Sequence, residues 1–240
     1  MIIEAFTAAE LEDRFQFACH RSIACFNHCC RDLNQALTPY DVLRLRRRLE
    51  ITSGEFLLRY AREHIGPETG LPIVSLRFED DPQRACPFVT DAGCRVYEAR
   101  PASCRLYPLA RAVRRSRSDG HTSIHYAILQ EAHCRGFAES RTQTVQAWID
   151  AQDLATDFEM NDALMELIAL KNRLRPGPLS AEHRQWLRTV LYDLDLFRRR
   201  VAAGERMPLA GEPHPDSDDD LDWLKWALHW VRLNLFGRAH

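Results

Sequence analysis

Apolar residues recur with helical spacing through the second half of the chain. One stripe begins at Val145 and another at Leu164, each with apolar residues at i, i+3 and i+4. This period predicts amphipathic helices that each bury one face. Ser180 can cap a further, long helix, whose core stripe is Val190, Leu194, Phe197 and Val201.

The first half of the chain mixes helix signals with strand signals. Thr38 and Pro39 suit the start of one helix, and a second helix should begin near Ser53. Thr7-Ala8-Ala9-Glu10 has the form of a capping box, which predicts a short helix leading to Phe15 and Phe17. Residues 71–78 and 123–129 read as strands. Residues 86–108 contain three prolines and a glycine, so they cannot form one regular element.

These elements predict an α+β fold that is mostly helical, with an irregular cysteine-rich metal-binding core, a small sheet and surrounding helices. We expect four consecutive segments. They are a cysteine-cluster metal-binding domain at 1–140, a helical extension at 141–203, an acidic Pro-rich linker at 204–220 and an amphipathic helix at 221–240.

Composition limits the class of protein. Hydrophobic residues make up 45% of the 240 residues, which is enough for a sizeable core. The net charge of −2 gives no electrostatic reason to expect nucleic-acid binding. The first fifteen residues do not resemble a signal peptide, and no stretch of about 18 uncharged apolar residues predicts a transmembrane segment. We therefore expect a cytoplasmic protein.

All eight cysteines lie in the first 134 residues, in two clusters followed by one isolated cysteine. They are Cys19, Cys25, Cys29, Cys30, Cys86, Cys94, Cys104 and Cys134. Thiols stay reduced in the cytoplasm, so eight of them indicate metal ligands more than disulfides. Buried free cysteines would be the third explanation, but both clusters adjoin proline and glycine rather than apolar helix faces.

The spacing of the cysteines bears on which metal they hold. Zinc ribbons and knuckles use Cys-x2-Cys pairs, and this chain has none. Cys29 and Cys30 are adjacent, so their side chains diverge and do not easily bind one zinc ion together. Such a pair suits two sites or a polynuclear cluster, which favours an iron–sulfur cluster over zinc. Nearby histidines could replace a thiolate as ligand: His20, His28, His121, His125 and His133.

The stretch CPFVTDAGCRVYEARPASCRLYP, from Cys86 to Pro108, carries a family resemblance. It is similar to the second half of the YkgJ-type cysteine-cluster domain, a family associated with chelation of zinc or iron. The matching positions are Cys86, Pro87, Phe88, Cys94, Tyr97, Arg100, Pro101, Cys104 and Arg105. Cys29-Cys30 resembles the end of the family's first motif, although Cys19 and Cys25 are spaced more widely than the usual Cys-x2-Cys-x2-Cys-Cys. The wider spacing also resembles flagellin lysine-N-methylase. The resemblance implies metal binding and no particular reaction.

Two arginines suit the surroundings of such a site. A site with several thiolates is anionic, and the guanidinium groups of Arg100 and Arg105 could offset that charge and donate hydrogen bonds to sulfur. Ordinary surface ion pairs are the alternative. We expect Tyr97 and Tyr107 to be packing residues.

Three functions remain open. The first is an iron–sulfur protein used for electron transfer or redox sensing, with a protein redox partner. The second is a structural zinc domain that serves protein interaction, and the third is an enzyme resembling a protein lysine N-methylase. Whether the protein is an enzyme is left open, because the chain contains no G-x-S-x-G, no H-E-x-x-H and no glycine-rich phosphate loop.

The last predicted helix is unusually rich in tryptophan. Trp223, Trp226 and Trp230 stand at i, i+3 and i+7 and therefore share a face. The helix could pack on the protein's own core, or it could bind a partner or lie on a membrane surface.

Overall fold

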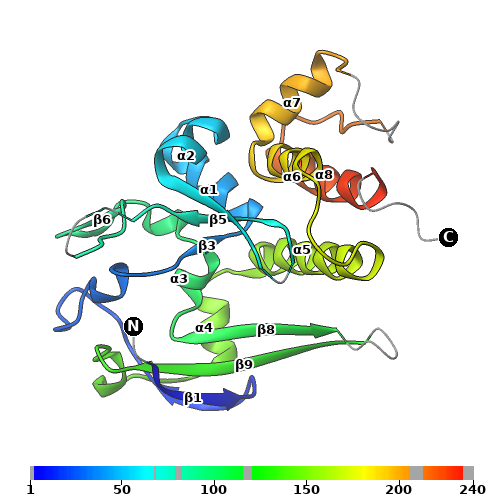
Figure 1. Cartoon of the computed structure of the whole chain (residues 1–240). Coiled ribbons are helices and arrows are strands. Elements are labelled where there is room, and N and C mark those ends of the chain that lie inside the picture. The colour runs from blue at the N-terminus through cyan, green and yellow to red at the C-terminus, as the bar shows by residue number, and fades with distance from the viewer. Residues whose placement is uncertain are drawn as a thin grey trace. The chain divides into compact units, whose positions relative to one another are not determined.

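The computed structural model describes residues 3–67, 69–78, 80, 83–115, 121–205 and 213–234. The fold is α+β and mostly helical, as predicted (Figure 1). The helices are α1 (Pro39–Leu49), α2 (Ser53–Tyr60), α3 (Ala102–Leu106), α4 (Val145–Ala151), α5 (Ala155–Leu174), α6 (Ala181–Leu187), α7 (Leu194–Ala202) and α8 (Asp220–Asn234). The strands are β1 (Ile3–Ala9), β2 (Arg14–Gln16), β3 (Ala36–Leu37), β4 (Ala61–Ile65), β5 (Pro72–Leu76), β6 (Val89–Thr90), β7 (Gly93–Cys94), β8 (Leu109–Arg115), β9 (Thr122–Glu131) and β10 (Thr142–Thr144).

The chain divides into two compact units, and each unit is built from two separate segments. We call Met1–Leu33 with Phe78–Thr156 the cysteine unit, because it holds all eight cysteines. We call Asn34–Arg77 with Asp157–His240 the helical unit. The consecutive segments expected from the sequence follow chain order, whereas these units interleave along the chain.

The cysteine unit contains an antiparallel sheet in the order β1-β9-β8, visible in Figure 1. Phe6 of β1 lies opposite Leu129 of β9. The short helix predicted after Thr7 is therefore wrong. Residues Thr7 to Ala9 belong to β1, because pairing with β9 satisfies their backbone groups and outweighs a local helix signal. The Asp13 carboxylate instead accepts a hydrogen bond from the Glu10 N–H (2.9 Å) in the turn before β2.

Phe17 is the centre of the core of the cysteine unit and is 1% exposed. Its ring packs edge-on against those of Phe137 (5.1 Å between ring centroids) and Trp148 (5.4 Å). The indole N–H of Trp148 donates to the Leu106 carbonyl (2.9 Å). Aromatic packing of this kind stabilises the part of the unit that lies outside the β1-β9-β8 sheet.

The helical unit begins as the sequence predicts. The Thr38 hydroxyl accepts from the Asp41 N–H (3.1 Å), and the Asp41 carboxylate accepts from the Thr38 N–H (2.8 Å). This reciprocal capping box, with Pro39 at the first helical position, fixes the start of α1. Helix α2 begins at Ser53, and the predicted strand at 71–78 is β5, which pairs with β3 and β4.

The long helix predicted after Ser180 is interrupted, so that part of the prediction is wrong. Ser180 does cap α6, accepting from the His183 N–H (3.2 Å). A π-helical turn at Arg188–Tyr192 follows, and Asp193 then leaves helical geometry and caps α7 through the Leu196 N–H (3.3 Å). Capping by Asp193 provides a local alternative to continuing the helix.

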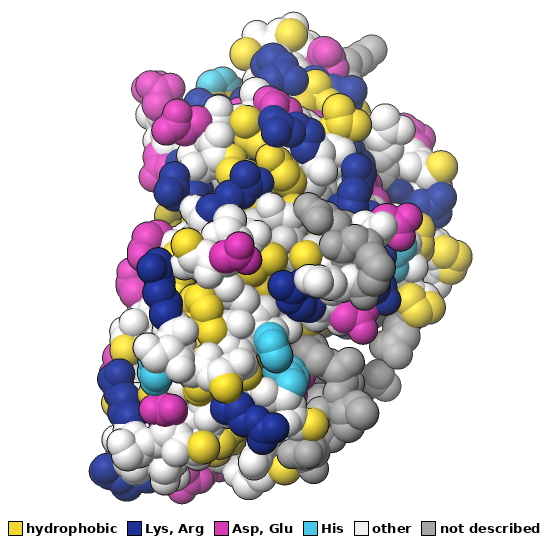
Figure 2. Space-filling model, turned by 90° about the vertical axis from the view of Figure 1, so that its left-hand side faces the viewer, with side chains coloured by type: hydrophobic (Ala, Val, Ile, Leu, Met, Phe, Trp, Pro, Cys, Tyr) yellow, Lys and Arg dark blue, Asp and Glu magenta, His cyan; other side chains and the backbone are white. Residues whose placement is uncertain are grey.

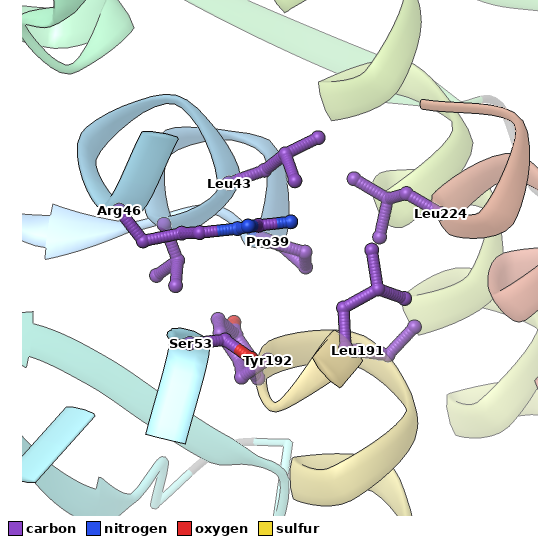
Figure 3. A pocket seen from close by; sticks show the side chains of 9 residues that line it. Pro39, Leu43, Arg46, Ser53, Leu191, Tyr192 and Leu224 are labelled. Atoms are coloured by element: carbon purple, nitrogen blue, oxygen red, sulfur yellow. The ribbon is translucent and has the colours of Figure 1, made fainter. Parts of the chain in front are cut away.

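Helix α8 packs on other helices of its own unit, which was one of its two predicted roles. Trp230 is 2% exposed, and its ring lies 6.0 Å from that of Phe197 and 6.1 Å from that of Trp186. Figure 3 shows Leu224 of α8 facing a cavity of about 10 Å³, lined by residues of α1, α2 and α7 and of the turn between α6 and α7. Residues 206–212 of the predicted linker lie outside the described residues.

The surface mixes charges of both signs. On the face drawn in Figure 2, hydrophobic side chains form small groups separated by Lys, Arg, Asp and Glu. Among the described residues, no helix has the length and apolar character needed to cross a membrane.

Candidate metal centre

The first cysteine motif lies in turns. The Ala18 N–H donates to the Gly136 carbonyl (3.1 Å), which fixes the start of the motif beside the segment of Cys134. The motif ends in a single 3-10 turn at His28–Cys30. Asn27 precedes this turn with φ of 66°, a left-handed conformation that asparagine adopts more readily than most residues. Local turns therefore position these cysteines, with no long helix or strand involved.

The second motif is also built from short elements. Arg31 forms an isolated antiparallel bridge with Ala85, and the Asp32 N–H donates to the Arg84 carbonyl (3.0 Å). Strands β6 and β7 then form a hairpin in which Val89 lies opposite Cys94. Cys104 follows on α3. This confirms that residues 86–108 do not form one regular element.

None of the eight cysteines, all of which are described, forms a disulfide. Cys19 is exposed, and the other seven are half-buried. Partial burial, together with the nearby thiols of Cys29, Cys25 and Cys134, raises the pKa of Cys19 to about 11 even though it is the most exposed of the set. The thiols of Cys25 and Cys29 also act on Cys134, whose pKa is raised first by burial. Four cysteines from two segments of the chain therefore lie near one another.

Cys29 and Cys30 interact directly. The Cys30 thiol is the largest cause that raises the pKa of Cys29 far above its usual range, and burial adds to it, so the two thiols lie close together. Cys30 thus joins the other four, and we call Cys19, Cys25, Cys29, Cys30 and Cys134 the five-thiol group. Cys86 and Cys94 form a separate pair, in which burial, with a smaller contribution from Cys94, raises the pKa of Cys86 to about 11.

Backbone N–H groups face several of the sulfurs. The Arg135 N–H donates to Sγ of Cys25 over 3.2 Å. Three other cysteines receive a hydrogen bond from the backbone N–H of the residue two positions later, and each bond acts to lower the pKa of the thiol. The donors are Phe88 for Cys86, Val96 for Cys94 and Gly136 for Cys134. Hydrogen bonds of this kind favour the thiolate, the form that binds metal. Sequence reasoning missed these donors, although a short turn after each cysteine could have suggested them.

The two predicted arginines lie in different surroundings. Arg100 stacks over the ring of Tyr97 (3.7 Å to the centroid) and lowers the pKa of both Cys19 and Cys94, so it faces thiols of both groups. Arg105 is 8% exposed and donates to the carbonyls of Gln152 and Asp153 at the end of α4. Its suggested role near sulfur stays a prediction.

A hollow of about 630 Å³ opens beside the five-thiol group. It is lined by residues that adjoin the cysteines: Phe26, Asn27, His28, Arg31, Gln83, Asp91 and His133. Two histidines have other partners, since Nε2 of His20 lies 3.2 Å from the Glu139 carboxylate and Nε2 of His125 lies 3.0 Å from the Ser123 hydroxyl.

The residues fit a metal in their chemistry. The donors are thiols, backbone N–H groups support four of them, and Arg100 can offset their charge. Within the described part of the chain, however, no three His, Cys, Asp or Glu side chains are already arranged to hold an ion. The thiols lie on turns and short elements, so closing around a metal requires these segments to move.

Comparison with known proteins agrees with this chemistry. Residues 18–135 match the family model CxxCxxCC, described as a "Putative zinc- or iron-chelating domain". No curated protein and no solved structure matches the chain. The match includes all eight cysteines. Residues 18–135, just under half of the chain, are therefore similar to the CxxCxxCC family.

Proposed function

We propose that the cysteine unit binds an iron–sulfur cluster through thiolates of the five-thiol group. The observation that carries the proposal is the gathering of Cys134 with three cysteines of the first motif, Cys19, Cys25 and Cys29, while the thiol of Cys30 lies close to that of Cys29. Both a tetrahedral zinc ion and an iron–sulfur cluster take four thiolates, so the argument rests on Cys29 and Cys30, which are adjacent in the chain and suit a site with several ligand directions. A polynuclear cluster accommodates more ligand directions than a single ion.

The chain's own residues prepare the site for negative charge. The Arg135 N–H already donates to Cys25, and the Gly136 N–H faces Cys134. Arg100 lies close enough to Cys19 to favour its ionised form. Such hydrogen bonds and charges set both the affinity of a thiolate site and the potential of a cluster held there.

The use that we propose is electron transfer or redox sensing with a protein partner. A bound iron–sulfur cluster supplies one-electron chemistry. Cys19 is exposed, so one edge of the five-thiol group is accessible to another protein. Eight cysteines without a disulfide suit a reducing compartment, and the cytoplasm is part of the proposal.

Anaerobic purification of the full chain, followed by iron, zinc and acid-labile sulfide analysis, tests the proposal. We expect a brown protein that contains iron and sulfide and absorbs near 400 nm. Cys29→Ser and Cys134→Ser should lose the colour, while Ser123→Ala, a change at a half-buried position of β9 in the same unit, should keep it. A colourless protein with stoichiometric zinc and no sulfide would replace the proposal with a structural zinc site.

A further inference from the structure

The hydroxyl of Tyr107 is buried, and it has no hydrogen-bond partner among the described residues. The ring is held in place, because it packs edge-on against the central Phe17 at 6.1 Å between centroids. Buried hydroxyl groups in folded proteins are nearly always hydrogen-bonded. A buried hydroxyl without a hydrogen-bond partner therefore calls for a group that accepts its hydrogen bond.

The backbone places Tyr107 beside the turn that carries Cys134. The carbonyl of Pro108 accepts from the Leu129 N–H (2.8 Å), so Tyr107 lies near the end of β9. Strand β9 finishes at Glu131, whose carbonyl accepts from the Cys134 N–H (2.9 Å). Burial is the largest cause that raises the pKa of Tyr107, and the Cys134 thiol and the Glu131 carboxylate raise it further, so both lie near the hydroxyl.

Glu131 is a less suitable acceptor for this proton. Its side chain is 5% exposed, and Oε2 lies 3.8 Å from Nε2 of His133, which competes for the carboxylate. The strength of a cysteine sulfur as a hydrogen-bond acceptor depends on whether it is a thiol or a thiolate. A neutral thiol accepts hydrogen bonds weakly, whereas a thiolate accepts a charge-assisted bond that is shorter and about twice as strong.

We propose that Tyr107 is a positioning residue for the metal. Its hydroxyl donates a hydrogen bond to the sulfur of Cys134 when that sulfur is a metal-bound thiolate, which holds the ligand in place and withdraws charge from it. The inference rests on the proposed function in one respect, which is that Cys134 binds the metal. It does not depend on whether the metal is iron or zinc.

The test measures affinity for zinc ion, by competition with a chromogenic chelator, in the full chain. Tyr107→Phe removes only the hydroxyl and should weaken zinc binding about 10- to 100-fold, the usual effect of losing a hydrogen bond to a ligand. Tyr97→Phe is the matched control, because Tyr97 is 56% exposed and its ring packs under Arg100. It should change the affinity less than about twofold, well below the effect of losing such a bond.

Two further measurements separate positioning from packing. In chelator, Tyr107→Phe should unfold at the same temperature as the wild type or higher, because no unpaired hydroxyl remains buried. In a Cys134→Ser background, Tyr107→Phe should have no further effect on zinc affinity.

Three results would overturn the inference. They are unchanged zinc affinity in Tyr107→Phe, an equal loss of stability with and without zinc, and the same loss of affinity in the Cys134→Ser background. The last result would assign the hydroxyl to Glu131 instead. Zinc binding by a wild-type protein that purifies without iron or sulfide would refute the cluster proposal and leave this test intact. A wild type that binds neither metal would overturn both.

Discussion

The backbone N–H of Cys86 donates a hydrogen bond to the carbonyl of Cys30 over 2.9 Å. This bond joins the last cysteine of the first motif to the first cysteine of the second. The Arg31–Ala85 bridge and the Asp32–Arg84 hydrogen bond extend the pairing by two residues. Two motifs that are far apart in the sequence therefore share one short antiparallel ladder, and movement of either motif is transmitted to the other.

Removing the metal should loosen both motifs together. Turns and short strands hold them, so metal ligation should supply much of their stability. With a chelator present, we expect the amides of Cys86, Asp32 and Cys134 to lose protection from hydrogen exchange. The amides of α5 and α8 in the helical unit should keep theirs, because apolar packing holds those helices. Protection that is retained in both motifs would show that the metal is not structural.

Asp220, at the start of α8, should be a critical carboxylate of the helical unit. It is 8% exposed and accepts from Arg46, from Nε of Arg47 (3.0 Å) and from Nη1 of Arg198 (2.7 Å). Asp220→Asn leaves three guanidinium groups around a neutral side chain. We expect the free energy of unfolding to fall by about 3 kcal/mol in urea denaturation, as for a broken buried ion pair.

Asp218→Asn provides the control for that measurement. Asp218 also lies near Arg198, at 3.7 Å, but its side chain is fully exposed. Solvent screening should make its effect much smaller than that of Asp220→Asn. If both variants lost the same free energy of unfolding, the burial of Asp220 would not strengthen its ion pairs.

Gly136→Ala should destabilise the cysteine unit. A Cβ atom there would lie 2.4 Å from the ring of Phe17 and 2.8 Å from the carbonyl of Ala18, closer than real contacts allow. We expect a loss of about 1–3 kcal/mol, the usual effect of overpacking a core. Combining the change with Phe17→Leu makes room for the methyl group, so the double variant should lose less than the sum of the single variants. Strictly additive losses would argue against this clash.

Acid should weaken the helical unit through Asp195. Burial alone would raise the pKa of this carboxyl, but hydrogen bonds from the N–H (2.6 Å) and hydroxyl (2.7 Å) of Ser53, with the charges of Arg46 and Arg199, lower it overall. Its stabilising effect is therefore complete above the ordinary value of about 3.9 and is lost as the pH falls through the lower folded value.

Urea denaturation between pH 6 and pH 2.5 checks this expectation. Asp195→Asn should remove part of the pH dependence, by less than about 1 kcal/mol because the group is partly exposed. Asp216→Asn, a change at an exposed aspartate, serves as the control. An identical pH profile for Asp195→Asn and the wild type would contradict the assignment.

Local signals in the sequence predicted the fold where no distant partner competed with them. Thr38 and Asp41 satisfy each other's backbone groups, so the start of α1 depends on neighbouring residues alone. Thr7 and Glu10 carry the same kind of signal, yet β9 pairs with this segment from more than a hundred residues away. Asp193 interrupts the helix after Ser180 because it caps α7, and its side chain also accepts from Ser53 of α2 (3.1 Å). Sequence spacing does not reveal such a distant partner.

The sequence indicated which residues are candidate metal ligands, but it did not indicate which backbone groups face them. Residue type and clustering identified the eight cysteines, because thiols are rarely gathered without a chemical reason. The backbone donors at Phe88, Val96 and Gly136 depend on turn geometry, which the residue types there do not specify. Tyr107 looked like a packing residue because the exposure of one hydroxyl atom cannot be read from sequence.

The interleaving of the two units has a consequence for synthesis on the ribosome. Chains emerge N-terminus first, and compact units fold as they become complete. Both segments of the cysteine unit have been synthesised once Thr156 is added. At that point Asn34–Arg77 still lacks the rest of the helical unit. Phe56 and Leu45, both fully buried in the finished fold, lie in that waiting segment. The thiols can therefore bind metal early in synthesis. Asn34–Arg77, which lies between the two cysteine motifs in the sequence, cannot complete its packing until α8 has been synthesised.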